Sequence, residues 1–167
     1  WAIRLGDFYL LGENHPTRDF ESLRLNDHGC EIVSGLCELY ASVHFALPEK
    51  KEAYRHAIHE MLDRILEVGR NEHGLFYVSI NPITGEILEE RVRDNWGYNF
   101  NAYYSVYLLD GVERYRDALL LALKAIGLQP GDEIIIPAYT LGELLPLMQA
   151  QGYRLVTADV EEDSFNI

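Results

Sequence analysis

The chain has 167 residues, of which 48% are hydrophobic and 25% are charged. This composition predicts one folded domain or slightly more, and it argues against global disorder. A net charge of −13 argues against a nucleic-acid partner, because nucleic-acid-binding surfaces need clustered Lys and Arg. No apolar run approaches the ~18 residues of a membrane span, and no leader pattern is visible, so we expect a cytoplasmic protein that does not bind membranes.

The two cysteines and the two ends of the chain allow further predictions. Cys30 and Cys37 lie seven residues apart on one predicted helix, about 10 Å along its axis. That separation is too long for a disulfide, so we expect two buried thiols in a reducing compartment. The chain begins at Trp1 and stops at Ile167 directly after a strand-like run, which led us to expect part of a longer protein.

The first half is predicted to be helical. Residues 1–11 have the character of a helix end, and residues 12–27 of a loop. Apolar residues then recur at helical spacing over 29–46. Pro48 suits the first position of a second helix, which ends near Gly69. The short link between the two helices predicts an antiparallel αα-hairpin.

A second helix pair is predicted over 98–109 and 113–126, joined at Asp110-Gly111. The connection before it, 70–97, is rich in turn signals, and 75–80 within it favours a strand or hairpin arm. The second helices of the two pairs share a pattern, Glu52-Ala-Tyr-Arg-His-Ala57 and Glu113-Arg-Tyr-Arg-Asp-Ala118. Such repeats bury their faces against neighbouring hairpins, so two pairs predict part of a larger ring or solenoid.

The last section predicts a strand–helix–strand unit. Gly127 suits a helix C-cap, and Pro130-Gly131 is turn chemistry. Strands at 133–136 and 153–159 enclose a helix at 141–151, which predicts a right-handed crossover and a parallel sheet. The predicted fold class is therefore mostly α, with αα-hairpin repeats in a partial toroid, followed by a short α/β unit.

The C-terminal residues resemble the DegT-type sugar aminotransferases, which are pyridoxal-phosphate enzymes of fold type I. The resemblance lies in Ala122-Leu-Lys-Ala-Ile-Gly, Pro130-Gly-Asp-Glu-Ile-Ile-Ile-Pro-Ala-Tyr-Thr140 and Ala158-Asp-Val-Glu-Glu-Asp-Ser-Phe-Asn-Ile167. It implies that 118–167 is a piece of the cofactor-binding domain, with Thr140 and Leu141 where the family usually places a residue that stacks on the cofactor. Asp159 ends a predicted strand, where ligands of α/β folds bind, so we also place it beside the cofactor.

The resemblance also implies that pyridoxal phosphate is not bound by this chain alone. The family's phosphate-binding Ser-Gly-Thr is expected just before Ala118, where this chain has Tyr115-Arg-Asp117. An acidic side chain there repels a phosphate. The Schiff-base lysine and the carboxylate that pairs with the pyridine nitrogen lie, in this family, beyond residue 167. Our leading hypothesis is a fragment or fusion that carries an incomplete aminotransferase domain.

Residues 1–117 resemble part of an (α/α)-toroid, the six-hairpin architecture of many glycoside hydrolases and polysaccharide lyases. The resemblance lies in Asp27-His-Gly-Cys-Glu31, Gly74-Leu-Phe-Tyr-Val78 and Asp94-Asn-Trp-Gly-Tyr-Asn-Phe-Asn-Ala-Tyr-Tyr104. It implies that the starts of the inner helices meet at one mouth of a barrel. This is the alternative hypothesis: an enzyme or module whose partner is a carbohydrate or nucleotide-sugar.

Paired carboxylates and aromatic rings at such a mouth are what glycoside chemistry requires. We take Asp27, Glu31 and Asp94 as candidate catalytic residues. The candidate substrate-binding residues are His28, Trp96, Tyr98, Asn99, Tyr103 and Tyr104, with Asn101 beside them. The competing interpretation is that both aspartates cap helices and the tyrosines form core.

We reject one further interpretation, a metal site, and keep another open, a structural scaffold. His56 and His59 share one helix face, but no second pair of ligands with supporting spacing accompanies them, so we predict no metal site. A third functional hypothesis is a helical scaffold that forms homo-oligomers through its uncovered faces.

Overall fold

The computed structural model describes residues 1–26, 30–92, 96–125, 127–137 and 144–159. The chain forms two compact units, Trp1–Ala125 and Ile126–Ile167. The division falls after the last long helix of the first unit. The aminotransferase resemblance suggested a domain boundary between residues 117 and 118. That boundary is based on sequence similarity alone, and it stays a prediction.

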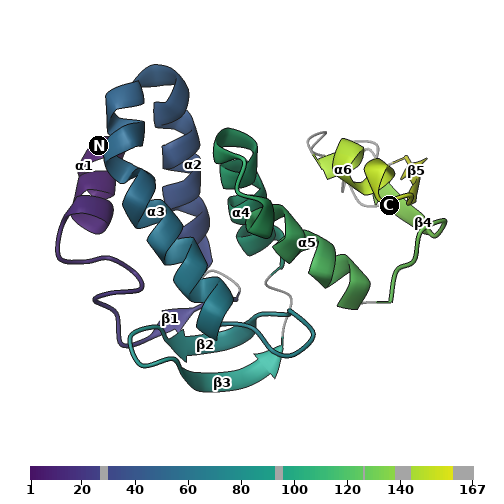
Figure 1. The fold of residues 1–167 in the computed structure, drawn as a ribbon, viewed down its shortest axis with the longest axis horizontal. Helices are drawn as coiled ribbons and strands as arrows, with labels where there is room; N and C mark the ends of the chain where they lie inside the picture. Colours follow the sequence, from purple (N-terminus) through teal and green to yellow (C-terminus); the bar gives the residue numbers. More distant parts are fainter. Residues whose placement is uncertain (27–29, 93–95, 126, 138–143, 160–167) are drawn as a thin grey trace. The chain divides into compact units, whose positions relative to one another are not determined.

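Four long helices build the first unit, as the hydrophobic spacing predicted (Figure 1). They are α2 (Glu31–Ala46), α3 (Pro48–Val68), α4 (Trp96–Asp110) and α5 (Glu113–Ala125). A short helix α1 (Ala2–Gly6) continues into the π-helical turn η1 (Asp7–Leu11) and precedes them. The helices α2 and α3 form one hairpin, α4 and α5 the other, and α2 packs against α4. Two neighbouring hairpins are therefore shown, whereas a closed ring stays a prediction.

The core of this unit lies along the inner face of α3. Pro48 occupies the start of the helix, where its missing N–H removes no hydrogen bond. Tyr54, Ile58, Met61, Leu62 and Ile65 are fully buried on this helix at helical spacing. The helix ends where the Gly69 N–H donates to the Ile65 carbonyl at 2.8 Å. The 3.6-residue period therefore predicted both the element and the face that it buries.

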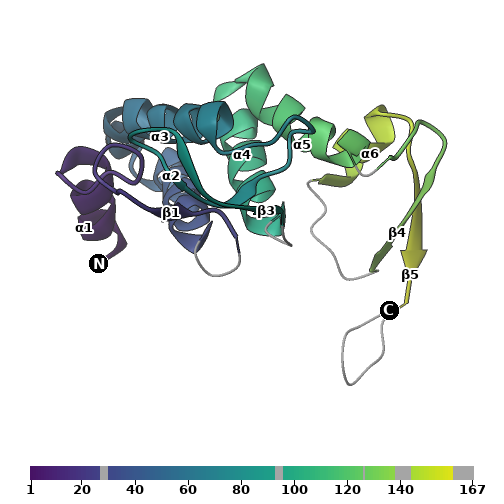
Figure 2. The same cartoon turned by 90° about the horizontal axis from the view of Figure 1, so that it is seen from below.

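A three-stranded antiparallel sheet closes one end of the hairpins (Figure 2). Its strands are β1 (Leu23–Arg24), β2 (Tyr77–Asn81) and β3 (Glu86–Val92), in that order. Only β2 was anticipated, because the mostly exposed β3 is acidic and shows weak apolar alternation. The Asn81 carboxamide accepts the Ile83 and Thr84 N–H groups, and Gly85 takes a φ of 80°, which turns the chain from β2 into β3.

The second unit is the predicted strand–helix–strand element. It contains β4 (Glu133–Pro137), α6 (Leu144–Ala150) and β5 (Arg154–Ala158), with β4 and β5 paired in parallel from Glu133↔Arg154 to Pro137↔Ala158. Before β4, Gly127 and Gly131 adopt φ values of 90° and 98°, as a helix cap and a turn require. Residues 141–143 of the predicted helix lie outside the described part of the chain.

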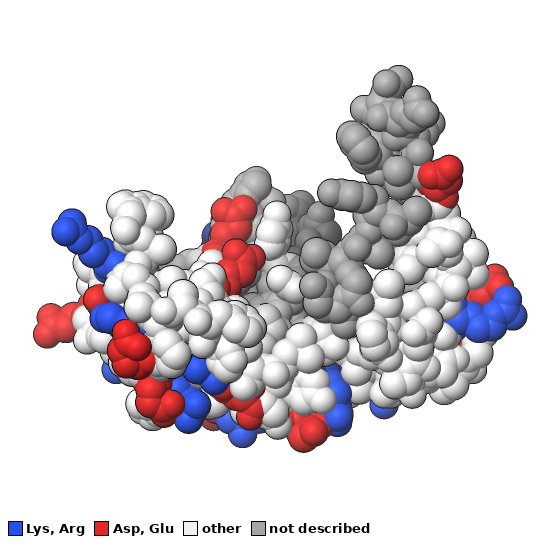
Figure 3. Space-filling model, turned by 90° about the horizontal axis from the view of Figure 1, so that it is seen from above, with Lys and Arg blue, Asp and Glu red and all other residues white. Residues whose placement is uncertain are grey.

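Two composition-based expectations can be compared with the structure. Cys30 and Cys37 are both buried and form no disulfide with each other, and burial raises the pKa of Cys37 far above its usual value. Among the described residues, no helix combines the length and the apolarity that crossing a membrane requires. On the face shown in Figure 3, described acidic and basic side chains lie interspersed and do not gather into one basic patch.

A buried polar cluster centred on Asp110 joins the two hairpins. Its carboxylate accepts hydrogen bonds from Tyr40 of α2 at 2.7 Å and from Lys51 of α3 at 2.5 Å. His59 Nε2 of α3 lies 2.8 Å from the same carboxylate. The Asp110 and Lys51 side chains are only 6% and 9% exposed. No sequence pattern indicated this cluster, because Asp110 precedes Gly111 and has the pattern of a loop residue.

Electrostatics keeps the Asp110 carboxyl ionised. Burial by itself raises the pKa of this carboxyl, but hydrogen bonds from Lys51, Tyr40 and His59 outweigh burial and hold the pKa below its usual 3.8. A folded-state pKa below the unfolded one adds stability that is complete above the unfolded value. That stability is lost as pH falls through the folded pKa.

We predict that Asp110→Asn lowers the free energy of unfolding by about 3–5 kcal/mol at neutral pH, because it leaves the buried Lys51 ammonium without its counter-charge. Urea denaturation followed by circular dichroism measures the change. The loss relative to the parent chain starts to shrink below about pH 4, where Asp110 of the unfolded chain becomes protonated, and it shrinks further as pH falls through the lower folded-state pKa.

The matched control is Asp63→Asn, which breaks the more exposed Asp63–Arg114 pair on the same helix layer. It is expected to cost at most about 1 kcal/mol. Equal losses for the two variants would show that the Asp110 cluster does not hold the hairpins together.

Candidate functional site

The starts of α2 and α4 lie at the same end of the first unit, beside the sheet (Figures 1 and 2). Near this end, Asn99 in the first turns of α4 bonds to Leu25 shortly before α2. At the other end, Tyr40 of α2 meets Asp110, the last residue of α4. The two helices therefore run in the same direction. We call the end formed by Leu25, Asn26, the first turn of α2 and residues 96–99 the helix-start region.

Asn99 holds this region together. The residue is fully buried, and its Nδ2 donates to the Leu25 carbonyl at 2.6 Å. The Leu25 N–H donates in turn to the Val78 carbonyl of β2 at 2.8 Å. Asn99 thereby links α4 to the sheet through the segment that enters α2. Its Oδ1 is buried without a hydrogen-bond partner in the described part of the chain.

Several predicted site residues lie outside the described residues. These are the candidate acids Asp27 and Asp94, the substrate candidate His28, and the cofactor candidates Thr140 and Leu141. Asn26 and Cys30 flank residues 27–29, and Trp96 follows residues 93–95.

The described candidates divide into exposed and buried residues. Trp96 is the first residue of α4, Glu31 is exposed on the first turn of α2, and Tyr98 is 51% exposed. Exposed aromatic and acidic side chains at one end suit a surface that contacts a polar ligand with apolar faces. Asn101 is partly exposed farther along α4.

Tyr103 and Tyr104 point to the packing alternative that the sequence left open. Tyr103 is fully buried, donates to the Leu62 carbonyl at 2.9 Å, and stacks on Phe76 with ring centroids 5.9 Å apart. Burial raises the pKa of its hydroxyl well above 10. Tyr104 is 6% exposed. These contacts join α4 to α3 and to the segment that leads into β2.

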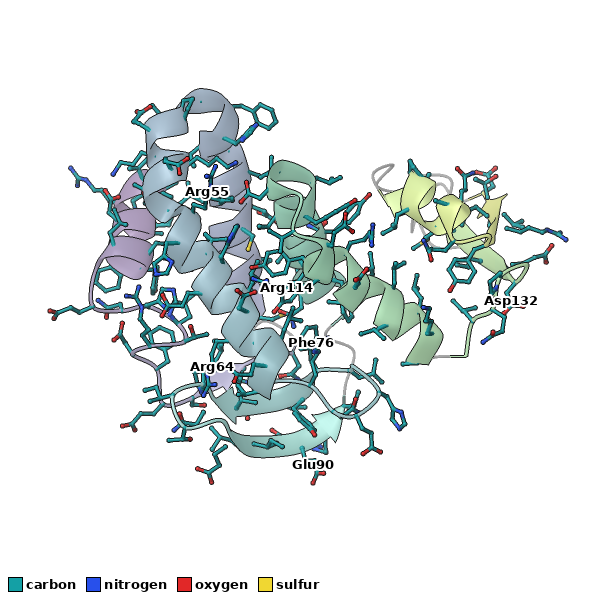
Figure 4. The ribbon with its side chains drawn as sticks, viewed as in Figure 1. Arg55, Arg64, Phe76, Glu90, Arg114 and Asp132 are labelled. Carbon is teal, nitrogen blue, oxygen red and sulfur yellow. The ribbon has the colours of Figure 1, made fainter. Side chains whose placement is uncertain are left out.

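A groove lies between α3 and α5, and Arg114, labelled in Figure 4, lies on its α5 wall. This groove has a volume of about 830 Å³. Charged and imidazole side chains dominate its walls, which comprise His56, His59, Glu60, Asp63, Arg64, Leu66, Glu67, Arg70, Arg114, Asp117, Ala118 and Leu121. The sequence indicated one part of it through the shared face of His56 and His59.

The two histidines differ in their surroundings. His59 is held against Asp110, and the Tyr115 ring packs edge-on at 5.8 Å from it. His56 is 93% exposed and lies 3.9 Å from Glu60. No group of three or more His, Cys, Asp and Glu suited to a metal ion occurs among the described residues.

The described residues do not fit a pyridoxal-phosphate aldimine site. Lys50 pairs with Asp7 at 2.6 Å, Lys51 is buried against Asp110, and Lys124 is exposed in the last turn of α5. None of the three belongs to the second unit. Asp159 directly follows β5, at the carboxyl end of a parallel strand, and its position beside a cofactor stays a prediction.

The segment expected to hold the cofactor's phosphate also lacks free donors. Tyr115 is fully buried, and its N–H donates to the Val112 carbonyl at 3.0 Å. Arg116 forms ion pairs with Glu113 at 2.5 Å and with Asp117 at 2.9 Å. Its guanidinium is thus already neutralised within α5.

The sequence model of the DegT/DnrJ/EryC1/StrS aminotransferase family matches residues 99–167. The match covers fewer than half of the residues, and it includes most of α4, all of α5 and the second unit. It begins earlier than Ala118, where the quoted motifs placed the start of the resemblance. No curated protein and no solved structure gives a match.

We predict that Asn99→Asp destabilises the first unit at neutral pH by about 1–3 kcal/mol. The new carboxylate would face the Leu25 carbonyl, which now accepts a hydrogen bond, and a buried acceptor would lose its donor. Protonation restores a donor, and burial beside a carbonyl raises the folded-state pKa of the new carboxyl above its unfolded value, so the loss should shrink as pH falls toward about 4 and be smallest below it. Urea denaturation at several pH values measures both effects.

Asn101→Asp is the matched control, because Asn101 lies on the same helix and is partly exposed. It should change stability by less than about 0.5 kcal/mol. An Asn99→Asp chain as stable as the parent at neutral pH would contradict the role given to this side chain.

Proposed function

We propose that the second unit, together with α5, is part of a DegT-type aminotransferase domain that binds pyridoxal phosphate. The family match over 99–167 carries this proposal. The parallel β4–α6–β5 unit supports it, because ligands of such sheets bind at the carboxyl ends of the strands. Thr140, Leu141 and Asp159 follow or lie close after those ends in sequence, so we propose them as cofactor-side residues.

The exposure of the β4–β5 pair also supports a part of a larger domain. Ile135 and Val156 are 62% and 39% exposed, although parallel strands of this composition are usually covered on both faces. A complete domain would supply the missing layers. The pyridoxal-phosphate chemistry itself requires a lysine that forms a Schiff base with the cofactor.

We propose that this chain alone is not catalytically competent. Lys50 and Lys51 are held in ion pairs of the first unit, and Lys124 is exposed on α5. Asp117, at the position where the resemblance places the phosphate site, adds a negative charge. These residues offer neither the covalent anchor nor the anion cradle of the cofactor.

The purified chain is therefore expected to form no saturable aldimine with added pyridoxal phosphate. Absorbance titration, borohydride reduction and peptide mass mapping measure this directly. Lys124→Arg is the matched control for adventitious labelling of the exposed lysine. A saturable aldimine band that disappears in one Lys→Arg variant would overturn the proposal.

The second candidate function is carbohydrate binding at the helix-start region. The observation that favours it is the Asn99–Leu25 hydrogen bond, which joins the first turns of α4 to the segment before α2. Asp27 and His28 follow Leu25 closely in sequence, and Asp94 precedes Asn99 by five residues. Exposed Glu31 and Tyr98 lie at the same end. Carboxylates paired with aromatic side chains are the groups that sugar recognition and glycoside chemistry use.

A Trp1→Phe chain tests this candidate, because it leaves Trp96 as the sole tryptophan reporter. Neutral and acidic oligosaccharides are titrated while Trp96 fluorescence is followed. We expect a saturable change, weakened about tenfold by Asp94→Asn through loss of a charged hydrogen bond to a sugar hydroxyl.

Glu90→Gln, an acid-to-amide change on the exposed strand β3, is the control and should leave the titration unchanged. Fluorescence that responds to no sugar would remove the support for carbohydrate binding. It would leave the aminotransferase proposal untouched, since that concerns the other unit.

A further inference from the structure

Arg70 lies just after α3, at a wall shared by two hollows of the first unit. One hollow is the α3–α5 groove described above. The other has a volume of about 320 Å³ and is lined by Leu66, Glu67, Arg70, Asn71, Glu72, His73, Gly74 and Leu121. The side chain of Arg70 is partly buried between them. No function discussed above uses this residue.

Most of the Arg70 guanidinium has no hydrogen-bond partner in the part of the chain that the structure describes. Its Nε donates to the Leu66 carbonyl at 3.0 Å, at the C-terminal end of α3. Its main chain pairs with Phe76 as an isolated bridge. Within the described ranges, neither Nη atom donates to a protein acceptor, and no carboxylate lies within ion-pair distance. The two-nitrogen edge of the guanidinium is therefore free to bind another group.

This situation is unusual in a chain with 27 acidic and 14 basic residues. The other described basic side chains that are partly or fully buried each have a carboxylate partner: Lys50, Lys51, Arg64 and Arg116. Arg70 lacks one, although burial disfavours its charged form and lowers its pKa. An unpaired, partly desolvated cation gains more from an anion than an exposed one does.

The acidic neighbours do not fill this role. Asp63 is bound by Arg114, and Glu67 is bound by Arg64 at 2.6 Å. Arg64 is itself fixed to the β2–β3 turn at the sheet end of α3, where Figure 4 shows it. Glu72 is 86% exposed and lies 3.5 Å from His73, so solvent screens its charge.

We propose that Arg70 forms an anion-binding site for a compact oxyanion, a carboxylate or a phosphate group. The planar Nη edge matches two oxygens of such a group, which a lysine cannot do. The partly exposed Leu121 lines both hollows and offers apolar contact to the carbon part of a carboxylate ligand. The ligand would enter from the smaller hollow, between Gly74 and the end of α3.

Two-dimensional NMR on the full chain tests the site, with sodium phosphate and sodium acetate titrated separately in a buffer free of other oxyanions, at an ionic strength held constant with sodium chloride. We expect saturable shifts of the amide signals of Leu66, Arg70 and Gly74 with at least one of the two anions. The anion that binds more tightly identifies the ligand class. Arg70→Gln should weaken that binding about tenfold or more, because it removes a charge-assisted hydrogen-bond pair.

Two more variants keep the test decisive if Arg70→Gln disturbs the end of α3. Arg70→Lys keeps the charge but loses the paired donors, so it should bind more weakly than the parent chain. Glu72→Gln removes a nearby negative charge without touching Arg70, and should strengthen binding about twofold. Arg91→Gln, on the exposed strand β3, is the control and should change nothing.

Absence of saturable shifts with both anions would overturn the proposal. So would titrations that are the same in the parent chain, Arg70→Gln and Arg70→Lys. If Arg70→Gln fails to fold, unchanged binding in both Arg70→Lys and Glu72→Gln overturns it equally.

Discussion

The first unit depends on one buried carboxylate. Asp110 ends α4, yet it binds Tyr40 on α2 and both Lys51 and His59 on α3. Tyr115 of α5 packs edge-on against the same His59 and donates to its carbonyl. All four long helices therefore meet at a single charge. Buried ion pairs seldom add much net stability, but they are costly to break and so fix a register.

That register determines what happens at the opposite end of the helices. With the end of α4 held by Asp110, its first turns lie where Asn99 reaches the segment entering α2. The same segment pairs with β2, so the sheet is joined to the helices at this point. The Asp110 cluster therefore holds one end of the bundle, and the Asn99 amide holds the helix-start region at the other end. Apolar side chains of α3 pack between these two points.

The hydrophobic periodicity predicted the long helices, the Pro48 start and the parallel β4–α6–β5 unit because these depend on local spacing and turn chemistry. It missed β1 and β3. Their exposed, acidic or very short segments carry little apolar alternation, and they become strands only by pairing with β2. For the candidate site, the sequence predicted that the starts of two helices converge, and it left open whether Tyr103 serves a ligand or the core. Its fully buried ring, bonded to the Leu62 carbonyl, has the contacts of a core residue.

The sequence by itself determined the two-part composition of this protein, with a helical section followed by a motif-bearing α/β section that matches an aminotransferase family. These features follow from the order of residues along the chain, so they can be recognised without knowing any tertiary contact. Only the tertiary structure decided which charges have partners. Asp110 was predicted to lie in a helix–helix link and is a buried centre, whereas Arg70, at the start of the predicted connection 70–97, is left without a counter-ion among the described residues. Charge pairing depends on distances between residues far apart in the chain, which no local pattern encodes.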